Sequence, residues 1–390
     1  MGRGEPPGEI TAEGAARPYA ALRVGTHRLA ILRDGAQTYH AMLEAIRAAR
    51  SAILFETYIL RDDETGRRFA EALCERSRAG VEVSLLYDAW GSDVSDEFLE
   101  ELHAAGVRTL AYHPLRFHGR LAAFFARIYR RDHRKILVVD GTVGFTGGVN
   151  ISDDYAVWGE EKRGWRDTHL RLEGPAVAEL QFRFLRAWRR HRGAPIDERR
   201  HESRGRRPDP LVRIVGTALP GQHGAIGRVY RKSIARAQQR IRITNAYFLP
   251  TIRVIRALRH AARRGVDVRV IVAGTTDVPA VRFASRALYE AFLKAGVRIF
   301  EWHGRVLHAK TATIDGSWST VGSSNLDTLS LRVNLEVNAV IEDAAFAAAL
   351  ERMFEEDLAH CREVTMADWH ARPLWERVVG GFALLFRRWL

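Results

Sequence analysis

The sequence predicts an α/β fold made of two similar βαβ-rich halves, each a mixed, mostly parallel sheet flanked by helices. Apolar, strand-like runs alternate with helical stretches of 10–18 residues, which is typical of βαβ units. The same order of elements occurs twice. A motif that contains histidine and lysine also occurs twice, 175 residues apart. We therefore expect two halves related by a pseudo-twofold axis, with a site at their interface.

The first half has a regular succession of elements. Buried-type apolar runs predict strands at 51–60, 81–87 and 107–112. Amphipathic stretches at 64–79 and 95–105 predict the two helices between them. Each helix thus connects two strands that we expect to lie parallel.

The second half repeats this order. Strands are predicted at 240–247, 266–273 and 297–302, and helices at 252–264 and 278–295. Even the turns correspond, because Gly80-Val81 and Gly265-Val266 each follow a helix that ends in basic residues.

Composition divides the chain further and limits its chemistry. A polar N-terminus at 1–20 precedes the first half at 21–190, and an Arg-rich linker at 191–210 leads to the second half at 211–362. A C-terminal amphipathic helix is expected at 363–390. Two cysteines in 390 residues exclude a disulfide scaffold and a cysteine-based metal site. No apolar run reaches the roughly 18 residues of a transmembrane helix, and the N-terminus does not resemble a secretory signal.

The net charge of +13 favours an anionic partner, such as a nucleic acid, an acidic membrane or a phosphorylated substrate. Only five of the 60 basic residues are lysine, and two of these occupy the same position in the two motif copies. A lysine kept in so arginine-rich a chain indicates a need for a compact ammonium group.

The motif itself is His-x-Lys-x4-Asp-Gly, followed by a glycine and an asparagine at fixed distances. The copies begin at His133 and His308, and the candidate catalytic residues are His133, Lys135, Asp140, His308, Lys310 and Asp315. Strand alternation places each histidine and its lysine on one face and turns the aspartate away, so we interpret Asp140 and Asp315 as structural. Each Asp-Gly pair predicts a two-residue type I′ hairpin turn.

That hairpin register would place residue 148 opposite His133 and residue 323 opposite His308. Asn150 and Asn325 would then share the histidine face. A neutral imidazole is a nucleophile or base near pH 7, while lysine and amide groups donate to phosphodiester oxygens. Two such sets facing each other suit in-line displacement at phosphorus. Since no residues have metal-ligand spacing, we expect chemistry without a metal or cofactor.

The double motif resembles that of the phospholipase D superfamily, over roughly residues 25–360. Within it the chain is most similar to bacterial cardiolipin synthases of the shorter B-type. The stretches that carry the resemblance are DHRKILVVDG, FTGGVNISDDY, WRDTHLRLEGPAV, HAKTATIDG and GSSNLDTLSLRVNLEVN. Thr328 departs from the proline that this family would have after Asn-Leu-Asp.

The resemblance implies a mechanism and a role for each residue. One histidine forms a phosphohistidine that carries the phosphatidyl group, and the other exchanges protons with the alcohols. His133 would be the nucleophile and His308 the acid/base. Asp167 and Glu336 would orient the histidines, and Asn150, Asn325 and Ser323 would bind the substrate phosphate. The implied reaction joins two phosphatidylglycerol molecules into cardiolipin and releases glycerol.

Two segments have the pattern of membrane-surface helices, which suggests a peripheral protein on the cytoplasmic face of a bacterial membrane. Apolar residues at 121–128 are flanked by arginines, and apolar residues recur at helical spacing from Pro373 to the C-terminus. The alternative is that the C-terminal helix packs on the enzyme body.

The sequence is also compatible with other functions. A phosphodiesterase of the same superfamily would explain the motifs and the charge, whereas a membrane scaffold would explain only the tail. We expect phosphatidylglycerol and an anionic membrane as partners and no nucleic acid. The sequence decides neither between phosphatidylglycerol and phosphatidylethanolamine as donor nor the oligomeric state.

Overall fold

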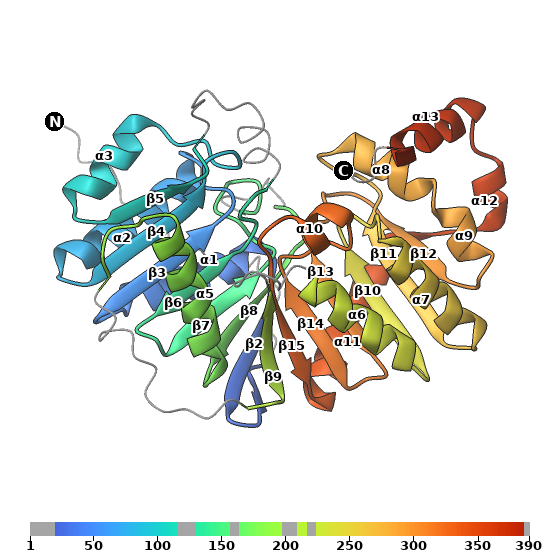
Figure 1. Ribbon diagram of the computed structural model, residues 1–390, viewed down its shortest axis with the longest axis horizontal. Coiled ribbons are helices and arrows are strands. Elements are labelled where there is room, and N and C mark those ends of the chain that lie inside the picture. The colour runs from blue at the N-terminus through green and yellow to red at the C-terminus, as the bar shows by residue number, and fades with distance from the viewer. Residues whose placement is uncertain (1–19, 115–129, 157–163, 197–208, 217–223, 386–390) are drawn as a thin grey trace.

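The computed structural model describes residues 20–114, 130–156, 164–196, 209–216 and 224–385 (Figure 1). Two eight-stranded sheets lie side by side, one from each half of the chain, with helices packed on both (Figure 1). The predicted fold class and the division into two similar halves are confirmed.

The first sheet has the order β1-β2-β8-β7-β6-β3-β4-β5. Its strands are β1 (Leu22–Val24), β2 (His27–Arg33), β3 (Ala52–Thr57), β4 (Glu82–Asp88), β5 (Arg108–Tyr112), β6 (Ile136–Val139), β7 (Val143–Gly147) and β8 (Thr168–Glu173). Its helices are α1 (Asp34–Arg47), α2 (Glu64–Arg78), α3 (Asp96–Ala104) and α5 (Ala176–Arg190).

The second sheet has the order β16-β12-β11-β10-β13-β14-β15-β9. Its strands are β9 (Val212–Gly216), β10 (Arg240–Asn245), β11 (Asp267–Ala273), β12 (Arg298–Trp302), β13 (Lys310–Ile314), β14 (Trp318–Gly322), β15 (Val337–Glu342) and β16 (Cys361–Val364). Its helices are α6 (Ala225–Arg236), α7 (Ile252–Arg263), α8 (Pro279–Arg286), α9 (Tyr289–Leu293), α10 (Thr328–Arg332), α11 (Ala344–Leu358), α12 (Met366–His370) and α13 (Leu374–Leu385).

Seven strands of each sheet match in order, as a pseudo-twofold arrangement requires, and β1 and β16 are additional strands at opposite edges. β2-β8-β7-β6-β3-β4-β5 in the first sheet corresponds to β9-β15-β14-β13-β10-β11-β12 in the second. The expectation of mostly parallel pairing was wrong. Parallel pairing joins β3, β4 and β5 in one sheet and β10, β11 and β12 in the other, and the remaining pairings described are antiparallel. The cause is the motif hairpin, which inserts an antiparallel pair in the middle of each sheet.

The predicted strands and helices occur close to their expected bounds, with one helix divided. The stretch 278–295 forms α8 and α9 instead of a single helix. The turn similarity is also confirmed, because Gly80 and Gly265 follow their helices with φ values of 88° and 91°. Glycine adopts this left-handed conformation at a helix end without steric cost.

The hairpin register differs by one residue from the predicted one. Asp140 and Gly141 have positive φ, as do Asp315 and Gly316, which fits the expected turn conformation. However, Val139 pairs with Val143 and Ile314 pairs with Trp318, so each loop has three residues instead of two. The predicted alignment of residue 148 with His133, and of residue 323 with His308, is therefore wrong.

Three large apolar clusters form the core, and one of them joins the two halves. One lies between α1, α2, α3 and the first sheet, and another lies between α6, α7, α8, α9 and the second sheet. The third contains residues of α5 and α11 together with residues of both sheets. Because this cluster is shared, the two halves pack as one body and the interface between them is fixed.

Several sequence expectations concern segments that the structure places differently or does not describe. The apolar segment at 121–128 and most of the linker at 191–210 lie outside the described residues, as do residues 1–19. The stretch from 363 onward contains the end of β16, then α12 and α13, instead of a single helix. No helix in the described ranges is long and apolar enough to cross a bilayer.

Candidate active site

Each motif histidine is paired with a carboxylate from the opposite half of the chain. His308 Nδ1 lies 2.7 Å from Asp167 Oδ2. His133 Nδ1 lies 3.1 Å from Glu336 Oε1 and 3.2 Å from Glu336 Oε2. Both carboxylates are fully buried. A carboxyl group at Nδ1 fixes the ring, and in its ionised form it holds the proton there, so that Nε2 carries the lone pair.

The backbone brings these partners together through two equivalent short bridges. The His133 N–H donates to Leu335 O at 3.0 Å, directly before Glu336. The His308 N–H donates to Arg166 O at 2.7 Å, directly before Asp167. Isolated parallel bridges join Asp132 to Leu335 and Arg166 to Leu307. The same two contacts therefore join the halves and assemble the site.

The two motif lysines are buried beside the histidines. Lys135 is 2% exposed and its Nζ donates to His133 O at 2.7 Å, while Lys310 is fully buried and its Nζ donates to His308 O. Burial lowers the pKa of Lys135 to about 7 and that of Lys310 to about 8. An ammonium has three N–H groups, so each lysine keeps donors for an anionic ligand.

Burial also determines the charge of the histidines. It lowers the pKa of His308 to about 4, and Lys310 lowers it further. The pKa of His133 falls well below its usual value through burial and the charges of Lys135 and Lys310. Both imidazoles are therefore neutral at pH 7, as a nucleophile requires. The influence of Lys310 on His133 shows that the two motif copies act on one another across the interface.

The two orienting carboxyl groups differ. His308 and Lys310 outweigh burial and hold the pKa of Asp167 below its usual value. Burial raises the pKa of Glu336 to about 8, although Lys135 opposes this shift. The Ser323 hydroxyl donates to Glu336, whereas the equivalent position in the first half is Gly148. A Cβ at Gly148 would lie 2.1 Å from Asp167 Oδ1, so this position must be glycine to leave room for the carboxylate.

The three residues predicted to bind phosphate have different surroundings. Asn150 accepts from the Ile59 N–H at 3.2 Å and donates to Tyr155 Oη at 2.7 Å. The Ser323 hydroxyl, which donates its proton to Glu336, accepts from the Val337 N–H at 3.1 Å. Asn325 is 2% exposed and its Oδ1 is buried without a hydrogen-bond partner. Phosphate binding by these residues stays a prediction.

Asp140 and Asp315 point away from the histidines, as strand alternation predicts. Asp140 accepts hydrogen bonds from the Arg50, Ser51 and Ala52 N–H groups and from the Ser51 hydroxyl, at 2.8–2.9 Å. Asp315 accepts from the Gln238, Gln239 and Arg240 N–H groups at 2.8–3.0 Å. Each carboxylate ties its hairpin turn to the start of the neighbouring strand, β3 or β10.

Aromatic side chains around the histidines were not predicted. The Tyr58 ring lies 4.7 Å from the His133 ring and 5.1 Å from Lys135 Nζ. The Tyr247 ring lies 6.3 Å from that of His308, and Tyr155 Oη is 3.3 Å from His308 Nδ1. Tyr58 and Tyr247 follow the equivalent strands β3 and β10, so the repeat could have identified this pair. No equivalent signal marks Tyr155.

The arrangement provides two neutral imidazoles and two ammonium groups at one interface. It can hold an anionic phosphodiester between a nucleophilic nitrogen and a second nitrogen that exchanges protons. In the described part of the chain, no group of three or more His, Cys, Asp or Glu residues is placed to hold a metal ion.

Comparison with known proteins gives a consistent result. A family model described as cardiolipin synthase, PLD-like domain, matches residues 42–188 and 230–358. Cardiolipin synthase B of Escherichia coli (strain K12) is 38% identical over 375 residues, which cover 93% of this chain and 88% of that protein. A cardiolipin synthase of Geobacillus thermodenitrificans is 34% identical over 376 residues, covering 93% and 73%.

Among solved structures, a phosphatidylserine synthase of Haemophilus influenzae has a TM-score of 0.67 at 14% identity, and the match covers 96% of this chain and 97% of that one. A polyphosphate kinase of Porphyromonas gingivalis has a TM-score of 0.59 at 13% identity, with coverage of 91% and 53%. These two likenesses concern the fold.

Proposed function

Because the chain belongs to the cardiolipin synthase family of phospholipase D-like proteins, we propose that it transfers a phosphatidyl group from one phosphatidylglycerol to another. The products are cardiolipin and glycerol. The single observation that carries this proposal is the pair of neutral histidines, each held at Nδ1 by a carboxylate from the other half. That pairing leaves two Nε2 atoms for chemistry at one phosphorus.

The first step forms a covalent intermediate. Nε2 of His133 attacks phosphorus, a P–N bond forms, and the bond from phosphorus to the glycerol oxygen breaks. His308 gives its Nε2 proton to that oxygen, and glycerol leaves. His308 must first be protonated, and the anionic phosphodiester favours this because its charge offsets the nearby lysines.

The second step reverses these roles. The terminal hydroxyl of a second phosphatidylglycerol gives its proton to Nε2 of His308, and its oxygen attacks phosphorus. The P–N bond breaks, and the electron pair returns to His133. Asp167 stabilises the His308 imidazolium in both steps, because its own pKa stays below the usual range. The energy of the broken ester bond is kept in the intermediate, so no nucleotide is needed.

The lysines supply the charge that this chemistry requires. Lys135 and Lys310 lie on the same strand face as their histidines and donate to the non-bridging oxygens, where negative charge increases in the transition state. Asn325, with a buried and unpaired Oδ1, is the further candidate for contact with the bound headgroup. We place the enzyme peripherally on the cytoplasmic face of a bacterial membrane, where both lipid substrates reside.

The test is lipid mass spectrometry after incubation of the pure protein with phosphatidylglycerol. Cardiolipin and glycerol in equal amounts are expected. Phosphatidic acid without cardiolipin would instead indicate hydrolysis, and a requirement for added phosphatidylethanolamine would change the donor. His133→Ala and His308→Ala should abolish the product, whereas His40→Ala, at an exposed position on α1, is the matched control and should have normal activity.

A further inference from the structure

Helix α13 has its larger apolar side chains on the side that faces away from the protein. Leu374, Val378 and Leu385 are 73%, 71% and 75% exposed. Their spacing places them on one face of the helix, and exposed Trp375, whose ring lies 6.1 Å from that of Phe283 on α8, borders them. We call Leu374, Val378 and Leu385 the outer face of α13. Such a contiguous apolar surface is uncommon on a protein that meets only water.

The opposite face holds the helix on the enzyme body. Figure 1 shows α13 packed across α8. A Cβ at Gly380 would lie 3.1 Å from Phe283 O, so the two helices approach closely. Ala383 and Leu384 pack against the core of the second half, and Arg286 bonds Glu376 at 3.1 Å. The helix is thus held on α8 and on the core of the second half, and its outer face stays exposed among the described residues.

Arginines border this outer face. Arg377 is exposed on α13, and Arg372 precedes the helix. Partial burial and the charges of Arg286 and Arg377 lower the pKa of Arg372 to about 10. Arg286 has acidic partners in Glu301 and Glu376. The surroundings of the helix therefore favour an anionic surface.

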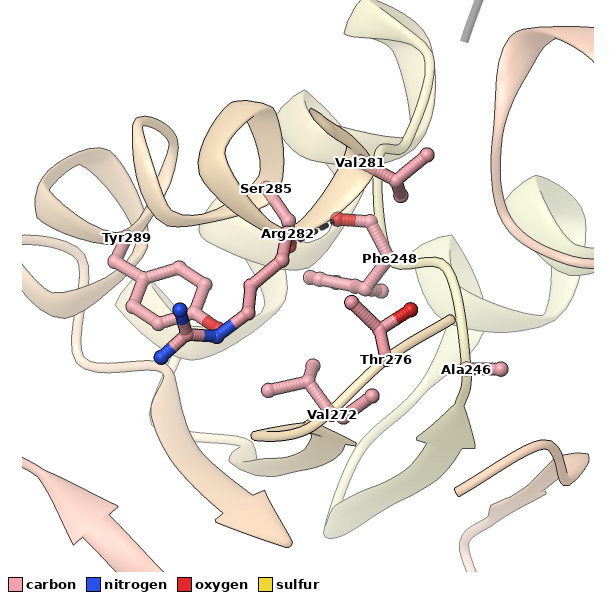
Figure 2. A pocket seen from close by; sticks show the side chains of 9 residues that line it. Ala246, Phe248, Val272, Thr276, Val281, Arg282, Ser285 and Tyr289 are labelled. Atoms are coloured by element: carbon pink, nitrogen blue, oxygen red, sulfur yellow. Dashed lines mark hydrogen bonds between the residues drawn. The ribbon is translucent and has the colours of Figure 1, made fainter. Parts of the chain in front are cut away.

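The position of α8 connects α13 with the active site. α8 follows β11, and between them Asp277 accepts hydrogen bonds from the Tyr247 hydroxyl at 2.6 and 2.7 Å. The Tyr247 ring faces His308. Figure 2 shows the side chains at the strand ends here: Val281 and Ser285 of α8 and Tyr289 of α9 lie around a cavity of about 10 Å³ that Phe248 and Val272 also line. The Ser285 hydroxyl donates to Phe248 O at 2.7 Å.

The equivalent edge of the first half carries an exposed aromatic residue. Trp90 follows β4, the counterpart of β11, and is 53% exposed. The Arg131 guanidinium lies 5.3 Å from its ring. Tryptophan beside arginine is typical of the interface between a membrane and water. Both halves thus present exposed apolar side chains at the end of the sheets where the histidines lie.

We propose that the outer face of α13 is a docking surface for an anionic lipid bilayer, in whose plane the helix lies. α8 would then hold the membrane surface at a fixed position relative to His308, so that a headgroup enters between the halves while its acyl chains stay in the bilayer. The inference rests on the proposed function for its choice of a lipid partner. The surface itself can be tested without catalysis.

The experiment measures co-sedimentation of the full chain with vesicles of equal parts phosphatidylglycerol and phosphatidylcholine. In the test variant, Leu374→Ser and Val378→Ser are combined. The matched control combines Phe182→Ser and Leu211→Ser, two exposed apolar residues on α5 and before β9. The test variant should lose about tenfold or more in vesicle partitioning, whereas the control and the melting temperatures of both should be unchanged.

Charge is tested separately with Arg377→Gln. This variant should bind the mixed vesicles more weakly at low salt and should bind pure phosphatidylcholine vesicles as the parent does. Unchanged vesicle binding by the Leu374 and Val378 variant would overturn the proposal. A second result would also overturn it: the variant keeps vesicle binding but loses a concentration-dependent self-association that the parent has. The outer face would then bind a second copy of the chain.

A soluble substrate separates this proposal from the proposed function. The test variant should convert short-chain, dispersed phosphatidylglycerol at the parent rate and vesicle phosphatidylglycerol much more slowly. If the parent makes no cardiolipin from either substrate, the proposed function fails, and the vesicle-binding result still decides the docking surface.

Discussion

Asp167 Oδ2 accepts a hydrogen bond from His308 Nδ1 at 2.7 Å, although the two residues are 141 positions apart and belong to different halves. Glu336 and His133, which are 203 positions apart, form the reciprocal pair. Neither half therefore contains a complete set of catalytic groups. The interface between the halves has to form before either imidazole has its orienting partner.

Because each histidine is paired with a carboxyl group of the other half, the structure predicts which variants have the same catalytic defect. Asp167→Asn should impair the enzyme in the same way as His308→Ala, with slow formation and turnover of the phosphatidyl intermediate, because the amide no longer stabilises an imidazolium. Glu336→Gln should act with His133→Ala and reduce the intermediate itself. We expect losses of about 10²–10⁴. Labelled lipid trapped on protein provides the measurement.

Asp93→Asn, at an exposed position outside the site, is the control for these variants and should label normally. If Asp167→Asn removes the label and Glu336→Gln keeps it, the roles of the two histidines are reversed.

Lys135→Arg and Lys310→Arg should each lower kcat/KM by about 10² or more even though the charge is kept. Both ammonium groups are buried against the carbonyl oxygen of their own histidine, so a planar, larger guanidinium must displace the strand or the ligand. Lys294→Arg is the control, because Lys294 is exposed and forms only a surface pair with Glu290. Turnover close to normal in either motif variant would show that charge alone is sufficient.

Gly148→Ala should inactivate the enzyme although it adds one methyl group. The new Cβ would lie 2.1 Å from Asp167 Oδ1, so the carboxylate must leave its position beside His308. We expect a loss of about 10² or more in kcat. Gly381→Ala, where the structure shows no neighbouring atom within 4 Å of the added carbon, is the matched control. Retained activity in Gly148→Ala would mean that Asp167 does not need its observed position.

Asp140→Gly should destabilise the fold and leave the chemistry intact. Glycine accepts the φ of 51° at this position, so the variant removes the carboxylate without adding backbone strain. Three backbone N–H groups and one hydroxyl lose their acceptor. We expect a loss of roughly 2–4 kcal/mol in the free energy of unfolding, measured in urea. Activity per folded molecule should change by less than about threefold; a larger drop would assign Asp140 to catalysis.

The lysines predict the pH dependence of the reaction. Lys135 and Lys310 bind phosphate only when protonated, and their pKa values are lowered to about 7 and 8. Raising the pH through this range removes their protons, so kcat/KM should fall above pH 7–8. The fall in kcat should come at higher pH, because bound phosphodiester favours the protonated lysines.

Initial rates measured between pH 5 and 10 would test this profile. The nucleophile His133 produces no loss until the medium is much more acidic, because burial and the charges of Lys135 and Lys310 hold its pKa well below the usual value. A rate that stays constant up to pH 10 would show that lysine protonation does not limit binding.

Much of this organisation follows from local sequence patterns. The alternation of apolar strands and amphipathic helices predicts the βαβ units, and the spacing within the motif predicts that His133 and Lys135 share a strand face while Asp140 turns away. These features depend on residues within one strand or turn, where a period of two and the conformation of Asp-Gly suffice. The resemblance to a known family then gives the chemistry.

Other features depend on the packing of distant elements. Each hairpin loop has a third residue, so the register differs by one from the predicted one. In the same loops, the carboxylates of Asp140 and Asp315 accept hydrogen bonds from backbone N–H groups at the start of β3 and β10. The antiparallel pairs within each sheet follow from the same insertion of the hairpin. Which carboxylate orients which histidine is decided by the backbone bridges at Leu335 and Arg166, because residues so far apart in the chain meet only when the halves dock. Likewise, helical spacing predicts an apolar face on α13, but only its contact with α8 determines which side of the helix packs inward and which side stays exposed.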